Sequence, residues 1–117
     1  MIQNIEHTEE MADLFISKFT TCSLRTKYPK FNILKGVPYY NSYLLPYLEV
    51  TPGYQVQEPS IDVTFGALTF TFIKTIGRYC GISHKVFWVG ISDGMDVPFY
   101  SVQTDADMDE IITLLED

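Results

Sequence analysis

The hydrophobic residues of this chain repeat with a helical period near both ends and with a strand period between them. The helical runs place an apolar residue at every third or fourth position; they are Met11, Leu14, Phe15 and Phe19, and later Met108, Ile111, Ile112 and Leu115. Between them, Leu68, Phe70 and Phe72 alternate with threonines, as in a half-buried strand. A chain that carries both periods packs helices against a sheet. The sequence therefore predicts an α+β fold: a small antiparallel or mixed sheet of three to five strands with the N- and C-terminal helices packed on it.

Polar residues mark where both helices begin. Thr8 precedes the first apolar run and predicts the N-cap of a helix over about residues 8–20. Thr104 holds the same position ahead of the last run. Acidic residues follow in both first turns, where the helix dipole favours negative charge: Glu9, Glu10, Asp105 and Asp107. The last helix ends on Glu116 and Asp117, the wrong sign for a helix C-terminus, so we expect its final turn to fray.

The region between the helices favours strands. Ala67–Thr75 shows the alternation described above, although Ser60–Tyr79 as a whole also fits a helical stripe; its Thr and Phe content favours strand. Lys85–Ser92 is apolar on both faces, which is typical of a strand inside a sheet. We therefore expect Val86–Ile91 to be the central strand, with Phe87 and Trp88 on opposite faces.

Prolines and a turn divide the remaining chain. After a turn at Ser92–Asp96, Val97–Val102 predicts a returning strand. Because Pro98 has no N–H to donate, this strand either lies at an edge of the sheet or begins at Pro98. The middle of the chain is broken by four prolines, and a short helix over Asn41–Leu48 requires Pro46 in its first turn or a kink.

Length and composition predict one domain, residues 1–117, that needs no metal or disulfide to fold. The start of the chain has no basic segment ahead of an apolar stretch, as a secretory signal would. The longest nearly uncharged stretch, Ser60–Ile73, is too short and too polar to cross a membrane. Cys22 and Cys80 match no zinc or disulfide pattern and are expected to be free thiols. Together these features predict a cytoplasmic protein without a cofactor or bound metal.

Charge is distributed very unevenly along the chain. Residues 1–85 contain seven acidic and eight basic residues, whereas residues 86–117 contain eight acidic residues and no Lys or Arg, which gives the whole chain a net charge of −7. The acids of the second region that we expect on one face are Asp93, Asp96, Asp105, Asp107, Asp109 and Glu110. Such a face attracts a basic partner by long-range steering. The alternative is an ordinary solvated surface, since net negative charge favours solubility.

Five tyrosines lie within sixteen residues of the proline-broken middle region. Tyrosine often anchors protein interfaces because it offers a large rigid surface and one hydroxyl. The candidates for such anchors are Tyr39, Tyr40 and Tyr43, which surround an expected exposed turn. The alternative is that these rings cover the core with their hydroxyls in water.

The acidic face and the tyrosines favour a protein-binding inhibitor over an enzyme. Nucleases and nucleic-acid-binding toxins are basic because they hold phosphate, so a protein that covers them benefits from being acidic. The sequence thus predicts an immunity- or antitoxin-type protein that neutralises a basic toxin or nuclease domain.

Two other functions stay open. A small enzyme or ligand-binding domain would use an aromatic-lined pocket, and Cys80 with His84 would be its nucleophile pair, although Gly81 between them indicates a turn rather than the helix that would bring them together. A nucleic-acid-binding module would use Arg25–Lys35, where four cations lie among aromatic residues. The overall negative charge opposes this second alternative.

Overall fold

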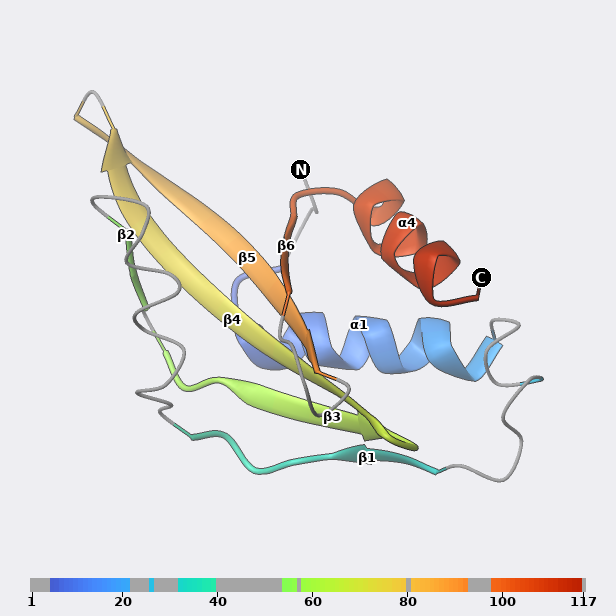
Figure 1. Cartoon of the computed structure of the whole chain (residues 1–117). Coiled ribbons are helices and arrows are strands. Elements are labelled where there is room, and N and C mark those ends of the chain that lie inside the picture. Colours follow the sequence, from blue (N-terminus) through green and yellow to red (C-terminus); the bar gives the residue numbers. More distant parts are fainter. Residues whose placement is uncertain are drawn as a thin grey trace.

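Two helices cover one face of an antiparallel sheet (Figure 1). The computed structural model describes residues 5–21, 26, 32–39, 54–56, 58–79, 81–92 and 98–116, without the side chains of 54–56, 78, 79, 84 and 116. The elements in chain order are α1 (Thr8–Thr21), β1 (Ile33–Lys35), β2 (Tyr54–Val56), β3 (Ile61–Phe65), β4 (Leu68–Tyr79), β5 (Ile82–Ser92), β6 (Phe99–Val102) and α4 (Asp105–Glu116). The expected α+β arrangement is confirmed, with one helix before the sheet and one after it.

The sheet is built around β4. The strand order is β1-β3-β4-β5-β6, and the short β2 pairs with the far part of β4 beyond the end of β3. All of these pairs are antiparallel. The turns β3–β4 and β4–β5 contain Gly66 and Gly81, both with positive φ, a backbone conformation that glycine adopts without a steric cost.

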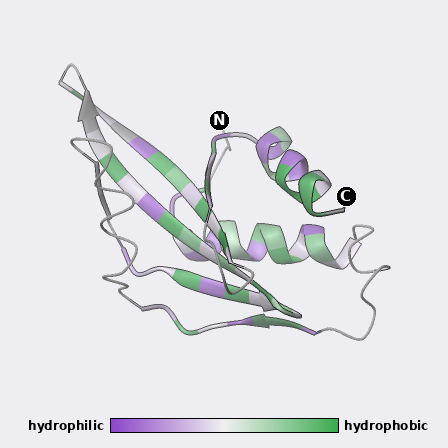
Figure 2. Cartoon of the chain, viewed as in Figure 1, coloured by the Kyte–Doolittle hydropathy of each residue, from purple (hydrophilic) through white to green (hydrophobic). Residues whose placement is uncertain are grey.

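The hydrophobic core lies between the sheet and the two helices. Figure 2 shows hydrophobic and hydrophilic residues alternating along the strands, which puts one set of side chains beneath the helices. The ring centroids of Phe15 on α1 and Phe72 on β4 are 5.0 Å apart, and those of Phe19 and Phe70 are 4.7 Å apart. All four rings are fully buried. Burying each contributes on the order of 1.5–3 kcal/mol, so α1 is held mainly by aromatic packing.

Two lysines join the sheet to the segment that precedes α1. Lys74 on β4 is buried, and its Nζ donates to the backbone oxygen of Glu6 at 2.6 Å. Lys85 on β5 donates to the backbone oxygen of Ile5 at 2.8 Å. These bonds satisfy backbone carbonyls just before the helix and fix the position at which α1 begins.

The start of α1 differs from the expected cap. Thr8 is buried and is the first helical residue, and the carboxylate of Glu58 accepts hydrogen bonds from both its backbone N–H and its hydroxyl. A carboxylate 50 residues away along the chain therefore caps α1 instead of the Thr8 side chain. At α4 the expectation is confirmed, because Thr104 Oγ1 accepts from the N–H of Asp107 at 3.2 Å.

Most strand predictions are confirmed, with one correction. Residues 60–79 form two strands rather than a helix. The segment expected at the centre of the sheet, Val86–Ile91, lies in β5, one strand away from the centre. The central strand is β4, because β2 and β3 pair along one of its edges and β5 along the other. Pro98 precedes β6, which is the last strand on its side of the sheet among the described strands, so both expectations for this proline hold.

Phe87 and Trp88 belong to different hydrophobic clusters and lie on opposite faces, as expected. The expected turn at Ser92–Asp96 falls largely, and the expected helix at Asn41–Leu48 entirely, outside the described residues. No helix among the described residues is long and apolar enough to cross a membrane.

Candidate partner-binding groove

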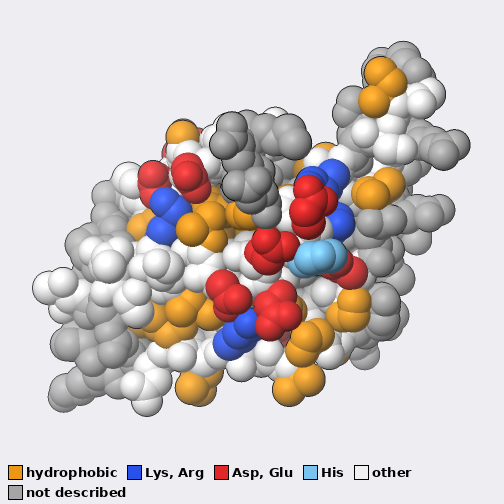
Figure 3. Space-filling view, turned by 180° about the vertical axis from the view of Figure 1, so that it is seen from behind, with side chains coloured by type: hydrophobic (Ala, Val, Ile, Leu, Met, Phe, Trp, Pro, Cys, Tyr) orange, Lys and Arg blue, Asp and Glu red, His pale blue; other side chains and the backbone are white. Residues whose placement is uncertain are grey.

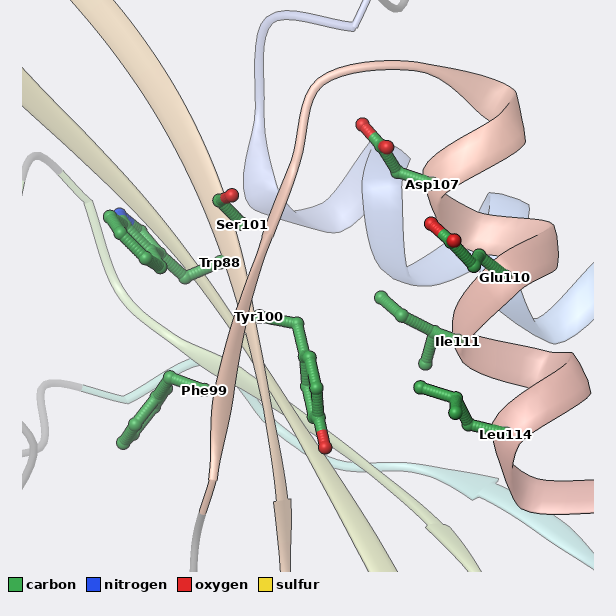
Figure 4. A pocket seen from close by; sticks show the side chains of 8 residues that line it. All are labelled: Trp88, Phe99, Tyr100, Ser101, Asp107, Glu110, Ile111 and Leu114. Atoms are coloured by element: carbon green, nitrogen blue, oxygen red, sulfur yellow. The ribbon is translucent and has the colours of Figure 1, made fainter.

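A groove of about 400 Å³ lies between the edge strand β6 and helix α4 (Figure 4). Its lining comes from β5, from β6 and from one side of α4: Trp88, Phe99, Tyr100, Ser101, Asp107, Glu110, Ile111 and Leu114. Five of these eight side chains are aromatic or aliphatic. The volume falls within the range of known ligand sites, about 300–1,000 Å³.

The groove runs along the outer edge of β6 rather than over one face of the sheet. Ser101 pairs with Trp88, and both project from the face that the helices leave uncovered. Tyr100 projects from the opposite face and packs against the main core beneath the helices. Figure 4 shows these side chains on the two sides of the β6 ribbon. A hollow lined from both faces has to pass around the strand edge.

Two carboxylates lie on the α4 side of the groove. Asp107 and Glu110 are three residues apart, so they are neighbours on one helix face. Beside them are Ile111, which is buried, and Leu114, whose side chain is 58% exposed. A large aliphatic side chain exposed to this degree next to a hollow is available for contact with another molecule. The groove thus combines an apolar floor with an acidic rim.

Asp107 also holds the start of α4. Its Oδ2 accepts from the backbone N–H of Gln103 at 2.8 Å and of Thr104 at 2.9 Å. These two backbone hydrogen bonds lower the pKa of Asp107 below its usual value, more than its slight burial raises it. The carboxylate is therefore firmly ionised at neutral pH, in a fixed orientation.

The other expected acids of α4 have different surroundings. Asp105 is exposed at the first position of the helix. Asp109 is also exposed, but its Oδ1 lies 2.8 Å from Nζ of Lys18 on α1. This ion pair joins α1 to α4 across 91 residues of sequence. The fold therefore supplies to α4 a positive charge that its own sequence lacks.

Charges on the helical side of the molecule are mixed. Figure 3 shows acidic side chains in small groups with lysines rather than in one uninterrupted area. Lys35, for example, lies 2.9 Å from carboxylate oxygens of both Glu9 and Asp13. Of the acids expected on one face, Asp107 and Glu110 meet in the groove, with Asp105 and Asp109 on the same helix. Asp93 and Asp96 lie outside the described residues.

Tyr39 has an internal role. It is half-buried, its backbone forms an isolated bridge with Ser60, and its hydroxyl donates to the Asp62 carboxylate at 2.8 Å. The hydroxyl expected to serve an interface thus holds the segment after β1 against β3. Tyr40 and Tyr43 lie outside the described residues.

The residues of the alternative sites are described only in part. Cys80 and the side chain of His84 lie outside the description, while Gly81 between them forms the expected turn. Arg25, Lys27 and Lys30 are likewise outside it. Among the described residues, no three His, Cys, Asp or Glu side chains are grouped to hold a metal ion.

The apolar part of the groove was not expected from the sequence. Trp88, Tyr100 and Leu114 each read as ordinary core or surface residues. The edge position of β6, which Pro98 indicated, was the only available signal that these residues could border an open site.

A second hollow, of about 260 Å³, lies where the loop before β3 meets the start of α1. Glu58 and His7 line it, with His7 Nδ1 3.1 Å from Glu58 Oε2. Burial raises the pKa of Glu58, but the hydrogen bonds from Thr8 and His7 and the charge of Lys74 outweigh burial and lower it. Glu58, the carboxylate that lines this hollow, already has a structural role as the cap of α1. We therefore assign no binding function to the hollow.

No protein-family model, no curated protein and no solved structure matches this chain.

Proposed function

We propose that this protein acts in the cytoplasm as a binding protein rather than an enzyme, an immunity- or antitoxin-type inhibitor that occludes a basic toxin or nuclease domain. The observation that carries the proposal is the groove along the outer edge of β6, with its apolar floor and the acidic rim of Asp107 and Glu110. Interfaces of this kind bury apolar anchors at the centre and use charge at the rim for partner selection.

The charge of α4 supports a basic partner in particular. Four acids lie on this helix before its last turn, and within the described part of the chain only Asp109 among them forms an ion pair with a lysine, Lys18. A negative surface accelerates association with a positive one, and the acceleration decreases as salt rises. A nuclease or nucleic-acid-binding toxin carries the required positive surface where it holds phosphate.

The test compares two triple charge reversals. The first is Asp105→Lys, Asp109→Lys and Glu110→Lys on α4; the second is Glu9→Lys, Glu10→Lys and Asp13→Lys on α1. Both change the net charge by the same amount, both put lysines into a first helical turn, and both remove ion pairs between elements. Any difference between the two variants in the rate of association with the partner therefore depends on where on the surface the reversed charges lie.

The partner is first isolated from a lysate of the source organism, identified by mass spectrometry, and purified. We expect one molecule of this protein to abolish the activity of one molecule of a basic partner. The α4 reversal should slow association at least about tenfold at low salt, and the α1 reversal much less. The proposal is wrong if no basic protein is retained at low salt, or if both reversals slow association equally.

A second candidate function is a small-ligand domain, which the three aromatic residues of the groove favour. Drug-sized ligands are usually enclosed over most of their surface. The groove instead passes around a strand edge and is open on both sides of the sheet, which suits an elongated segment better. Binding of a metabolite with no basic protein partner would establish this second function.

A further inference from the structure

We propose that the groove receives an extended, basic segment of the partner, which adds to the sheet as a further strand along the outer edge of β6. This inference rests on the proposed function and specifies how the partner binds. Addition of a strand to an exposed sheet edge is a common mode of peptide recognition, in which main-chain hydrogen bonds give affinity and side-chain pockets give specificity.

The pairing of β6 with β5 determines which backbone groups face outward. Ile91 N donates to Pro98 O at 3.0 Å, so residues 91 and 98 form a hydrogen-bonded pair. Hydrogen-bonded and non-hydrogen-bonded pairs alternate along an antiparallel ladder. Tyr100 and Val102 therefore direct their backbone groups toward β5, whereas Ser101 directs its N–H and C=O away from the sheet. No described strand pairs with this outer edge.

An added strand would present alternate side chains to the two halves of the groove. One set would lie over Ser101 and Trp88 on the face without helices. The other set would point toward α4, where an apolar side chain meets Tyr100 and Leu114 and a basic one meets the carboxylates. Strand residues i and i+2 are about 7 Å apart, which is close to the 5–6 Å between neighbouring side chains on a helix face. Two such strand residues can therefore contact two neighbouring positions of α4, one acidic and one apolar. The expected pattern in the partner is thus Lys or Arg two residues from an apolar residue.

Charge complementarity selects this occupant. A second copy of the chain would bring its own Asp107 and Glu110 against the same rim and be repelled. The carboxylates also repel the phosphates of a nucleic acid. A cationic segment gains from both carboxylates, and Asp107 is already oriented by the backbone of Gln103 and Thr104.

The first experiment leaves the protein unchanged. A displayed library of random seven-residue peptides is selected on the full chain, and each backbone amide of an enriched peptide is then methylated in turn. We expect enrichment of the basic-x-apolar pattern and an affinity loss of at least about tenfold at alternate amides, because only alternate amides face β6. Peptides without this pattern, or methylation effects without alternation, would overturn the proposal, as would an absence of enrichment.

The second experiment changes the edge itself. Ser101→Pro removes the outward N–H without removing a bond to β5, and proline is tolerated at sheet edges. Ser101→Ala is the matched control, since it removes only the side-chain hydroxyl. We expect the proline variant alone to lose at least about tenfold in peptide affinity, with thermal unfolding by circular dichroism showing that both variants are folded.

The strand-addition proposal and the inhibitor proposal can be contradicted independently of each other. If a basic partner is inhibited and depends on the α4 acids but binds Ser101→Pro normally, strand addition is wrong and the inhibitor function stands. If peptides show the alternating methylation effect but no basic protein is inhibited, the strand-addition site stands and the inhibitor function is wrong.

Discussion

Single residues connect parts of this molecule that are distant in sequence. Glu58 caps α1 from the loop before β3, and Lys74 reaches the backbone of Glu6 from inside the sheet. Neither role was predictable, because a cap supplied from 50 residues away leaves no local pattern. Thr104 was predictable for the opposite reason, since its cap lies within its own helix turn.

Replacing Glu58 with alanine removes an acceptor from the start of α1. We expect a loss of about 1–2 kcal/mol in the free energy of unfolding, measured by urea denaturation. Glu110→Ala, at an exposed position, should change it by less than about 0.5 kcal/mol. Equal effects of the two changes would show that Glu58 does not stabilise the helix.

The stabilisation by Glu58 should also depend on pH. Its pKa is lowered in the folded protein, so the unfolded chain takes up a proton at a higher pH than the folded one does. The contribution is fully present above the ordinary value of 4.5 and is lost as pH falls through the lower folded pKa. The difference between wild type and Glu58→Ala should therefore shrink as the pH is lowered from about 6 to about 3. A difference that stays constant would contradict this.

Gly90 makes room for an aromatic ring that lines the groove. A Cβ at this position would lie 2.6 Å from Cε1 of Phe99, so the ring would have to move. We expect Gly90→Ala to cost about 1–3 kcal/mol of stability. Combining it with Phe99→Ala should cost less than the two single changes added together, because the clash is then absent. Additive costs in urea denaturation would contradict this account.

At the level of elements, the sequence predicted where helices and strands lie along the chain better than it predicted which elements lie side by side in the fold. The apolar periods predicted α1, α4, β4 and β5, since each period reports which face of an element is buried. The order of the strands depends on pairing between distant segments, so β4 rather than β5 proved to be central. The groove was missed because its lining comes from β5, β6 and α4 together, and no single segment records that combination.

The cap of α4 offers a test within one element. Thr104→Ala should lower the free energy of unfolding by about 1 kcal/mol because the N–H of Asp107 loses its acceptor. Thr113, an exposed threonine in the same helix, bonds only the oxygen of Asp109. Thr113→Ala should be neutral or slightly stabilising, because alanine favours helix. Urea unfolding of both variants would decide between a cap and a general effect of losing threonine.

The whole molecule is elongated, with extents of 47 × 28 × 25 Å. In Figure 1 the β4–β5 hairpin extends well beyond the two helices at its turn end. Near that turn Ile82 is 61% exposed, whereas Phe72 and Val89 beneath the helices are fully buried. Folding also redistributes the uneven charge of the sequence, since it brings Lys18 to Asp109.

This shape predicts uneven stability along a single pair of strands. We expect amide hydrogen exchange near Tyr79 and Ile82 to proceed by local opening, and that of Phe72 and Val89 to require global unfolding. Exchange measured by NMR in low concentrations of urea would separate the two cases. Equal dependence on urea at both ends of the hairpin would mean that it opens only as a unit.

The position of α4 as the last described element also affects synthesis on the ribosome. Translation produces α1 first and α4 last among the described elements, and the core needs Met108, Ile111 and Ile112 from α4. Until those residues leave the exit tunnel, the apolar face of the nascent sheet is incompletely covered and open to chaperones or to aggregation. The helix that carries the acidic rim thus also completes the fold, so the groove of a nascent chain forms only as its core closes.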